Sequence, residues 1–173
     1  MRDDVAPVEG MHAELGLLMA AMRDSTREWR QNLELPSDEA MVWRMFPDGP
    51  SIGGVMLHMA GCEMFWIEKF AMGRELDAAN PAVIYDRDLD VEAVKWPDAP
   101  REPVSWYFGV LDETRKRMTA LIREHNEPER VHRFPDGEEM TMRWILAHLV
   151  EHDSYHGGQA VLLHEAWKRI GRG

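Results

Sequence analysis

The chain has 173 residues, a length at which one domain buries a full core without disulfides, so we expect a single domain over residues 1–173. Apolar residues make up 45% and charged residues 29%, which is ordinary for a globular protein and excludes a disordered chain. The formal net charge of −11 opposes binding to a phosphate backbone, and we therefore expect no nucleic-acid partner.

No segment of the sequence has the pattern of a membrane span or of a secretory signal. The longest apolar runs, such as residues 144–147, are far shorter than the ~18 consecutive apolar residues that a membrane span needs. Residues 1–7 lack the basic start and the apolar stretch of a secretory signal. The sequence therefore predicts a cytoplasmic protein that has no membrane partner.

Two long helices are predicted in the first half of the chain. Apolar residues recur with helical spacing over residues 9–33, and Pro36 follows the end of this pattern. The second helix is expected to begin at Ser51, which is a good N-cap residue. It is expected to run to about residue 72, where Gly73 provides a C-terminal stop.

Two further helices are predicted in the second half. One spans residues 103–125, with Pro103 in the first turn, and the other begins with Thr141 as N-cap and runs to about residue 170. Because no alternating strand pattern stands out, the four amphipathic helices predict an all-α four-helix bundle. The bundle is expected to contain two long crossover connections. The longer one is expected to be a packed crossover rather than a lid.

Histidines supply the candidate metal ligands. His152 and His156 are one helical turn apart, so both imidazoles project from the same face of the fourth helix. Zinc needs further ligands, and His58 is the natural third because it interrupts a strongly apolar run. Cys62 is the only cysteine, which excludes a cysteine-rich zinc site. Spacing alone leaves open hydrogen-bonded core histidines without a metal, and also a site built on His148 and His152.

Two motifs resemble those of the DinB/YfiT-like superfamily. Residues 146–159, LAHLVEHDSYHGGQ, are similar to the C-terminal signature in which a His-x3-His-x-Gly-Gln run ends the metal site. Residues 51–60, SIGGVMLHMA, resemble the second-helix motif of the same superfamily. The resemblance covers nearly the whole chain and implies a DinB-type four-helix bundle with a divalent-metal site. The positions that match the three metal ligands are His58, His152 and His156.

The resemblance also suggests roles for residues near the ligands. Gln159 matches a family glutamine and is expected to orient a ligand or a bound water. Glu63 follows His58 in an arrangement that resembles the mycothiol-dependent maleylpyruvate isomerase branch, which implies a catalytic base or a hydrogen-bond acceptor beside the site. The alternative for Glu63 is a solvated helix residue. Many relatives carry a basic residue where this chain has Gly157, so one substrate contact is expected to be missing or supplied elsewhere.

The function that the resemblance implies is that of a metal-dependent thiol S-transferase. Such a protein activates a low-molecular-weight thiol, such as bacillithiol or mycothiol, toward a small electrophile, and zinc is expected ahead of nickel or other ions. Two alternatives stay open: a metal-dependent hydrolase of small amides or esters with Glu63 or Asp153 as base, and a non-catalytic binding or stress-response protein. A homodimer is expected. The candidate walls of the substrate cleft are Trp66, Trp106, Tyr107 and Trp144.

Overall fold

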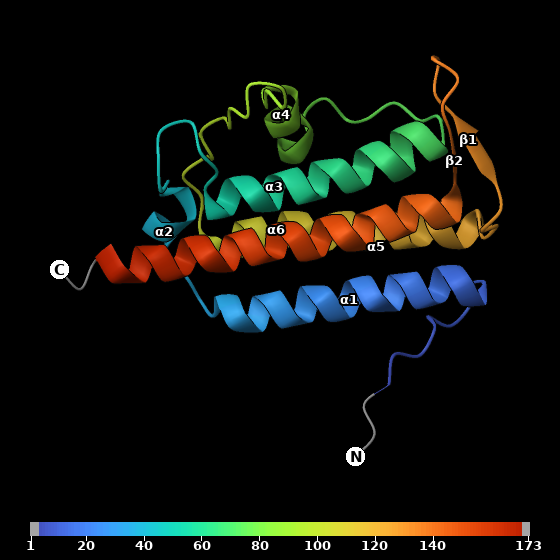
Figure 1. Ribbon diagram of the computed structural model, residues 1–173, viewed down its shortest axis with the longest axis horizontal. Helices are drawn as coiled ribbons and strands as arrows, with labels where there is room; N and C mark the ends of the chain where they lie inside the picture. The colour runs from blue at the N-terminus through green and yellow to red at the C-terminus, as the bar shows by residue number, and fades with distance from the viewer. Residues whose placement is uncertain (1–3, 171–173) are drawn as a thin grey trace.

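Four long helices lie side by side in the computed structural model, which describes residues 4–170 (Figure 1). They are α1 (Ala13–Leu33), α3 (Ile52–Glu63) with its π-helical continuation η1 (Met64–Ala71), α5 (Val104–Glu124) and α6 (Met142–Ile170). Helix α6 packs against both α1 and α3, and α3 also packs against α5. The predicted all-α bundle is therefore confirmed. Within the described residues, no helix combines the length and the apolar character that crossing a membrane requires.

Shorter elements lie in the connections between the long helices. They are α2 (Asp38–Val42), α4 (Pro81–Arg87), β1 (Val131–Arg133) and β2 (Glu139–Thr141). The two strands pair antiparallel, with His132 opposite Met140. This hairpin was not predicted, because three residues per strand are too few for an alternating pattern to stand out.

Local capping explains where the helices begin and end. The first helix begins at Ala13 rather than near residue 9, because Gly10 adopts a left-handed φ of 77° and the His12 side chain caps the helix. The Ser51 hydroxyl accepts a hydrogen bond from the Gly54 N–H at 3.2 Å, as expected for an N-cap. At the other end of the same helical segment, Gly73 has a φ of 64° and provides the predicted stop.

The end of the second long helix is π-helical, which the sequence pattern did not indicate. The N–H of Met72 donates to the carbonyl of Ile67 at 3.1 Å, a bond between residues five apart. In this geometry Phe65 and Phe70 both reach Phe134 of the hairpin loop, at ring-centroid distances of 6.4 and 3.9 Å. Residues five apart point in different directions on an α-helix, so the π-helical turns are what bring these two rings together.

The longer connection crosses over α3 and is packed against it. The Tyr85 hydroxyl of α4 donates to the carbonyl of Pro97 at 3.0 Å, and the Trp96 N–H donates to the carbonyl of Asp48 at 3.0 Å. Close approach depends on glycine, because a Cβ at Gly54 would overlap the Tyr85 hydroxyl. The connection is a packed crossover, as expected, and it carries groups that reach the histidine cluster.

Candidate metal centre

Three histidines from two helices meet at one point. His58 comes from α3, and His152 and His156 come from successive turns of α6. One ring nitrogen from each lies within 4.8 Å of the others, and the Nε2 atoms of His58 and His152 are 3.1 Å apart. Within residues 4–170, His148 is not part of this group. The structure therefore brings together the three residues that the family resemblance selected.

Two oxygen acceptors hold two of these imidazoles by their Nδ1 atoms. The Nδ1 of His58 lies 2.8 Å from Oδ1 of Asp86, and the Nδ1 of His156 lies 2.7 Å from Oε1 of Gln159. Since both oxygens act as acceptors, Nδ1 carries the proton and Nε2 keeps its lone pair for a ligand bond. Gln159, one turn after His156 on α6, thus contacts a histidine of the cluster.

Asp86 was missed by the sequence analysis. It lies on α4, 28 residues after His58, and no local motif links the two positions. The close approach needs a glycine on α3, since a Cβ at Gly61 would overlap the Asp86 carboxylate. The long crossover therefore contributes to the site, because it carries the acceptor that orients His58.

Burial disfavours the charged forms of His152 and His156. Desolvation, followed by the neighbouring His156, lowers the pKa of His152 to about 2. Desolvation, followed by His58, lowers the pKa of His156 to about 4. Both imidazoles are neutral at physiological pH, which is the state that binds a metal.

The donor set fits a divalent transition-metal ion. Three neutral imidazole nitrogens without a thiolate are the ligand set of catalytic zinc sites, which keep a coordination position open, and other divalent ions also accept such ligands. The Trp96 ring stands edge-on to His58 and to His156, at ring-centroid distances of 5.4 and 6.1 Å, so it covers one side of the cluster.

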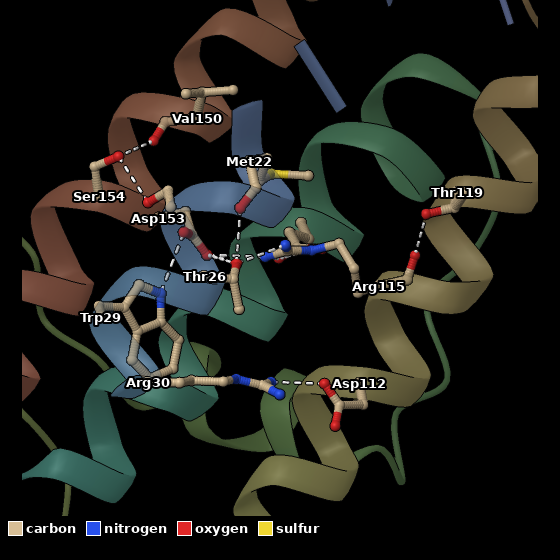
Figure 2. A network of polar contacts seen from close by, with 12 residues as sticks. Met22, Thr26, Trp29, Arg30, Asp112, Arg115, Thr119, Val150, Asp153 and Ser154 are labelled. Atoms are coloured by element: carbon tan, nitrogen blue, oxygen red, sulfur yellow. Dashed lines mark hydrogen bonds and ion pairs between the residues drawn. The ribbon is translucent and has the colours of Figure 1, made fainter. Parts of the chain in front are cut away.

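Glu63 forms a buried ion pair with Arg115. Figure 2 shows the other partners of this cluster, with Thr26, Trp29 and Asp153 near the Arg115 guanidinium. The Glu63 side chain is 3% exposed, and both of its carboxylate oxygens accept hydrogen bonds from Arg115 Nε at 2.9 and 2.8 Å. The same guanidinium donates to Asp153 at 2.9 Å, and Trp29 donates to the other oxygen of Asp153 at 3.2 Å. Glu63 is therefore not a solvated helix residue, and it does not join the histidine cluster.

The charge balance of this cluster sets the pKa of Glu63. Burial raises the pKa of Glu63 above its ordinary value, while the charge and hydrogen bonds of Arg115 lower it. One guanidinium faces two carboxylates, so Arg115 holds Glu63 and Asp153 together. The arrangement ties α3, α5 and α6 to one another.

Cys62 is a protonated, half-buried thiol. Burial raises its pKa well above the ordinary range, and the nearby carboxylates of Asp86 and Glu63 raise it further. Cys62 therefore behaves as a small apolar residue rather than as a thiolate.

The four aromatic candidates for a cleft wall separate into two groups. Trp66 and Trp144 flank His148, at centroid distances of 5.1 and 5.3 Å, and His148 lies 5.9 Å from His152. Trp106 and Tyr107 lie on α5 and contact each other edge-on at 5.0 Å between ring centroids, and Tyr107, 1% exposed, packs against Gly53 of α3. The structure therefore brings Trp66 and Trp144, but not Tyr107, to the α6 histidines.

Gly157 is a packing residue. A Cβ at this position would overlap the indole ring of Trp29, which belongs to α1. Position 157 consequently faces the α1–α6 interface, where a basic side chain such as those of many relatives has no room.

The sequence matches one protein-family model over most of its length. Residues 17–168 match the family model described as mycothiol-S-transferase. The chain belongs to the mycothiol-S-transferase family. This family is part of the DinB-like superfamily, so the resemblance is confirmed. The matched residues include the histidine cluster, Asp86 and Gln159. A search among curated proteins finds no match to the chain.

Proposed function

We propose that this protein is a divalent-metal-dependent S-transferase that joins mycothiol to a small electrophile. The observation that carries the proposal is the convergence of His58, His152 and His156, whose ring nitrogens lie within 4.8 Å of one another. Membership of the mycothiol-S-transferase family supports mycothiol as the thiol substrate. Zinc is the expected ion, and nickel or another divalent ion fits the same ligands.

The chemistry follows from the neutral imidazoles. When bound, a divalent ion favours the deprotonated form of a sulfur ligand at physiological pH. In the overall transfer the thiol loses its proton, sulfur bonds to the electrophilic carbon, and the leaving group departs with the electron pair of the broken bond. Asp86 and Gln159 keep His58 and His156 oriented by accepting their Nδ1–H bonds.

Gln159 is accordingly proposed as a positioning residue, and the catalytic role predicted for Glu63 stays a prediction. Arg115 engages both oxygens of Glu63, which favours a role in joining the helices over proton transfer. The hydrolytic alternative needs a free carboxylate beside the metal, and both of its candidates, Glu63 and Asp153, bind Arg115. We therefore favour the transferase. The single domain, the homodimer, the cytoplasmic location and a stress role stay predictions.

The test is metal- and thiol-dependent conjugation by protein purified without a histidine tag. Protein loaded with zinc or nickel is incubated with mycothiol and a chromogenic aryl halide, and the thioether is measured by mass spectrometry. We expect turnover that disappears in metal-free protein and in His152→Ala. Absence of metal-dependent conjugates with any low-molecular-weight thiol would refute the transferase. Metal-dependent ester cleavage would then favour the hydrolase, and tight thiol binding without turnover the binding protein.

A further inference from the structure

A continuous line of rings runs along α6 from the histidine cluster toward the hairpin. Trp144, His148, His152 and His156 are spaced four residues apart, and successive ring centroids are 5.3, 5.9 and 4.2 Å from one another. At a rise of about 1.5 Å per residue, Trp144 lies about 12 Å from His152 along the helix axis. The line of rings therefore extends well past the three clustered histidines.

Aromatic side chains of η1 and of the hairpin loop lie beside this line of rings. Trp66 of η1 contacts His148 at 5.1 Å and Trp144 at 5.6 Å between ring centroids. Phe134, in the loop between β1 and β2, packs edge-on to Trp66 at 5.8 Å and stacks on Phe70 at 3.9 Å. The π-helical turns and the hairpin thus fix the position of Trp66 next to α6.

The line of rings ends at a hollow of about 490 Å³ against the hairpin. It is lined by Glu138, Glu139, Met140, Thr141 and Trp144. Trp144 is 45% exposed, so part of its ring is open to a ligand. Arg133 holds the Glu139 carboxylate across the hairpin by a hydrogen bond of 2.7 Å. An aromatic ring next to carboxylates suits a hydroxyl-rich ring, whose C–H face packs on the indole while its hydroxyls donate to the carboxylates.

We infer that mycothiol lies along α6, with its sulfur at the three histidines and its hydroxyl-rich rings in the hollow beside Trp144. This inference rests on the proposed function. In mycothiol the sulfur-bearing cysteine is joined to sugar and cyclitol rings, which gives the molecule a polar part distant from the sulfur. Glu138 and Glu139, in a chain with a net charge of −11, favour this uncharged thiol over thiols that carry carboxylates.

The experiment compares two thiols and four variants of the metal-loaded protein. The thiols are mycothiol and N-acetylcysteine amide, which is uncharged and lacks the rings. The variants are Trp144→Ala, Trp144→Phe, Glu138→Ala and, as a matched control, Leu162→Ala, which removes an exposed apolar side chain (63% exposed) elsewhere on α6. Initial rates give kcat and KM for each thiol and for the electrophile, and calorimetry gives the Kd of mycothiol without electrophile.

We expect Trp144→Ala to raise the KM and the Kd of mycothiol about tenfold, which corresponds to about 1.4 kcal/mol of binding free energy. The KM of N-acetylcysteine amide should not change. Trp144→Phe should recover most of the mycothiol affinity, Glu138→Ala should lose part of it, and Leu162→Ala should behave as wild type. If Trp144→Ala is poorly folded by circular dichroism, Glu138→Ala carries the comparison.

The inference and the proposed function fail in different ways. Conjugation that proceeds with unchanged mycothiol KM and Kd in Trp144→Ala and Glu138→Ala overturns the inference alone. A loss that is equal for both thiols, or one confined to the electrophile, also overturns it. Mycothiol binding that depends on Trp144 without any turnover overturns the transferase and keeps the binding site. Absence of both binding and turnover overturns both.

Discussion

The Nδ1 of His58 lies 2.8 Å from Oδ1 of Asp86, although the two residues are 28 positions apart and belong to different helices. This hydrogen bond orients the His58 imidazole and directs Nε2 toward His152. Such partners of metal-binding histidines change metal affinity when they are removed. Asp86 is therefore the residue of the crossover on which the proposed centre depends most directly.

Replacing Asp86 by Asn should weaken metal binding about 10–100-fold, because the carboxylate acceptor of His58 is lost. The measurement is competition for zinc with a chromogenic chelator. Asp88→Asn is the matched control, since Asp88 follows α4, is exposed, and pairs with Arg87. Equal zinc affinity in Asp86→Asn and wild type would show that the hydrogen bond has no part in the site.

Loss of any one of the three clustered histidines should abolish stoichiometric metal. We expect His58→Ala and His156→Ala to purify without metal, while His148→Ala keeps it, because the His148 ring stacks on Trp144 instead of joining the cluster. Elemental analysis of tag-free protein measures the metal content of each variant. Stoichiometric metal in His58→Ala, or its loss in His148→Ala, contradicts the assignment of ligands.

The metal-free protein should lose stability as the pH falls below about 6.5. The folded state holds the pKa of His156 at about 4 and that of His152 at about 2, both below the ordinary value of 6.5. Between pH 4 and 6.5 the unfolded chain therefore binds more protons, and the free energy of unfolding rises with pH. Each of these histidines adds at most about 1.4 kcal/mol per pH unit.

Urea denaturation between pH 4.5 and 7.5 measures this slope. His152→Asn should show a shallower dependence than wild type, because one titrating imidazole is removed while the other titrating groups stay the same. Parallel curves for the two proteins would be incompatible with a depressed His152 pKa.

Adjacent glycines of α6 should respond in opposite ways to alanine. Gly157→Ala forces a methyl group against Trp29, whose indole N–H bonds to Asp153, and should destabilise the protein by about 1–3 kcal/mol. Gly158→Ala meets open space and should stabilise the helix by up to about 1 kcal/mol. The denaturation midpoints of the two variants are measured at constant pH. Similar shifts of the midpoint in both variants would rule out the packing explanation.

Arg115 should be among the costliest polar side chains to remove. Arg115→Ala leaves the buried carboxylates of Glu63 and Asp153 without their shared cation, and a loss of about 3–5 kcal/mol is expected in urea denaturation. Lys116→Ala, at an exposed position of the same helix, should change stability by less than about 0.5 kcal/mol. A loss similar to that of Lys116→Ala would mean that the ion pairs contribute nothing.

Local signals in the sequence determined most of the helices and part of the site. The four long helices follow from the spacing of apolar residues, and caps such as Ser51 and the stop at Gly73 depend on neighbours in the chain. The pairing of His152 with His156 is local as well, because residues four apart share a helix face. His58 was a candidate third ligand because it interrupts an apolar run, and the family resemblance then favoured it over a site built on His148.

Tertiary structure alone decided what lies around these groups. The contact of Asp86 with His58 and the ion pairs of Glu63 with Arg115 join residues 28 and 52 positions apart. The π-helical turns that bring Phe65 and Phe70 to one ring form against the hairpin. The sequence pattern contains only short-range periodicity, whereas these contacts arise when separate helices pack and bury charge together, and their partners follow from that packing.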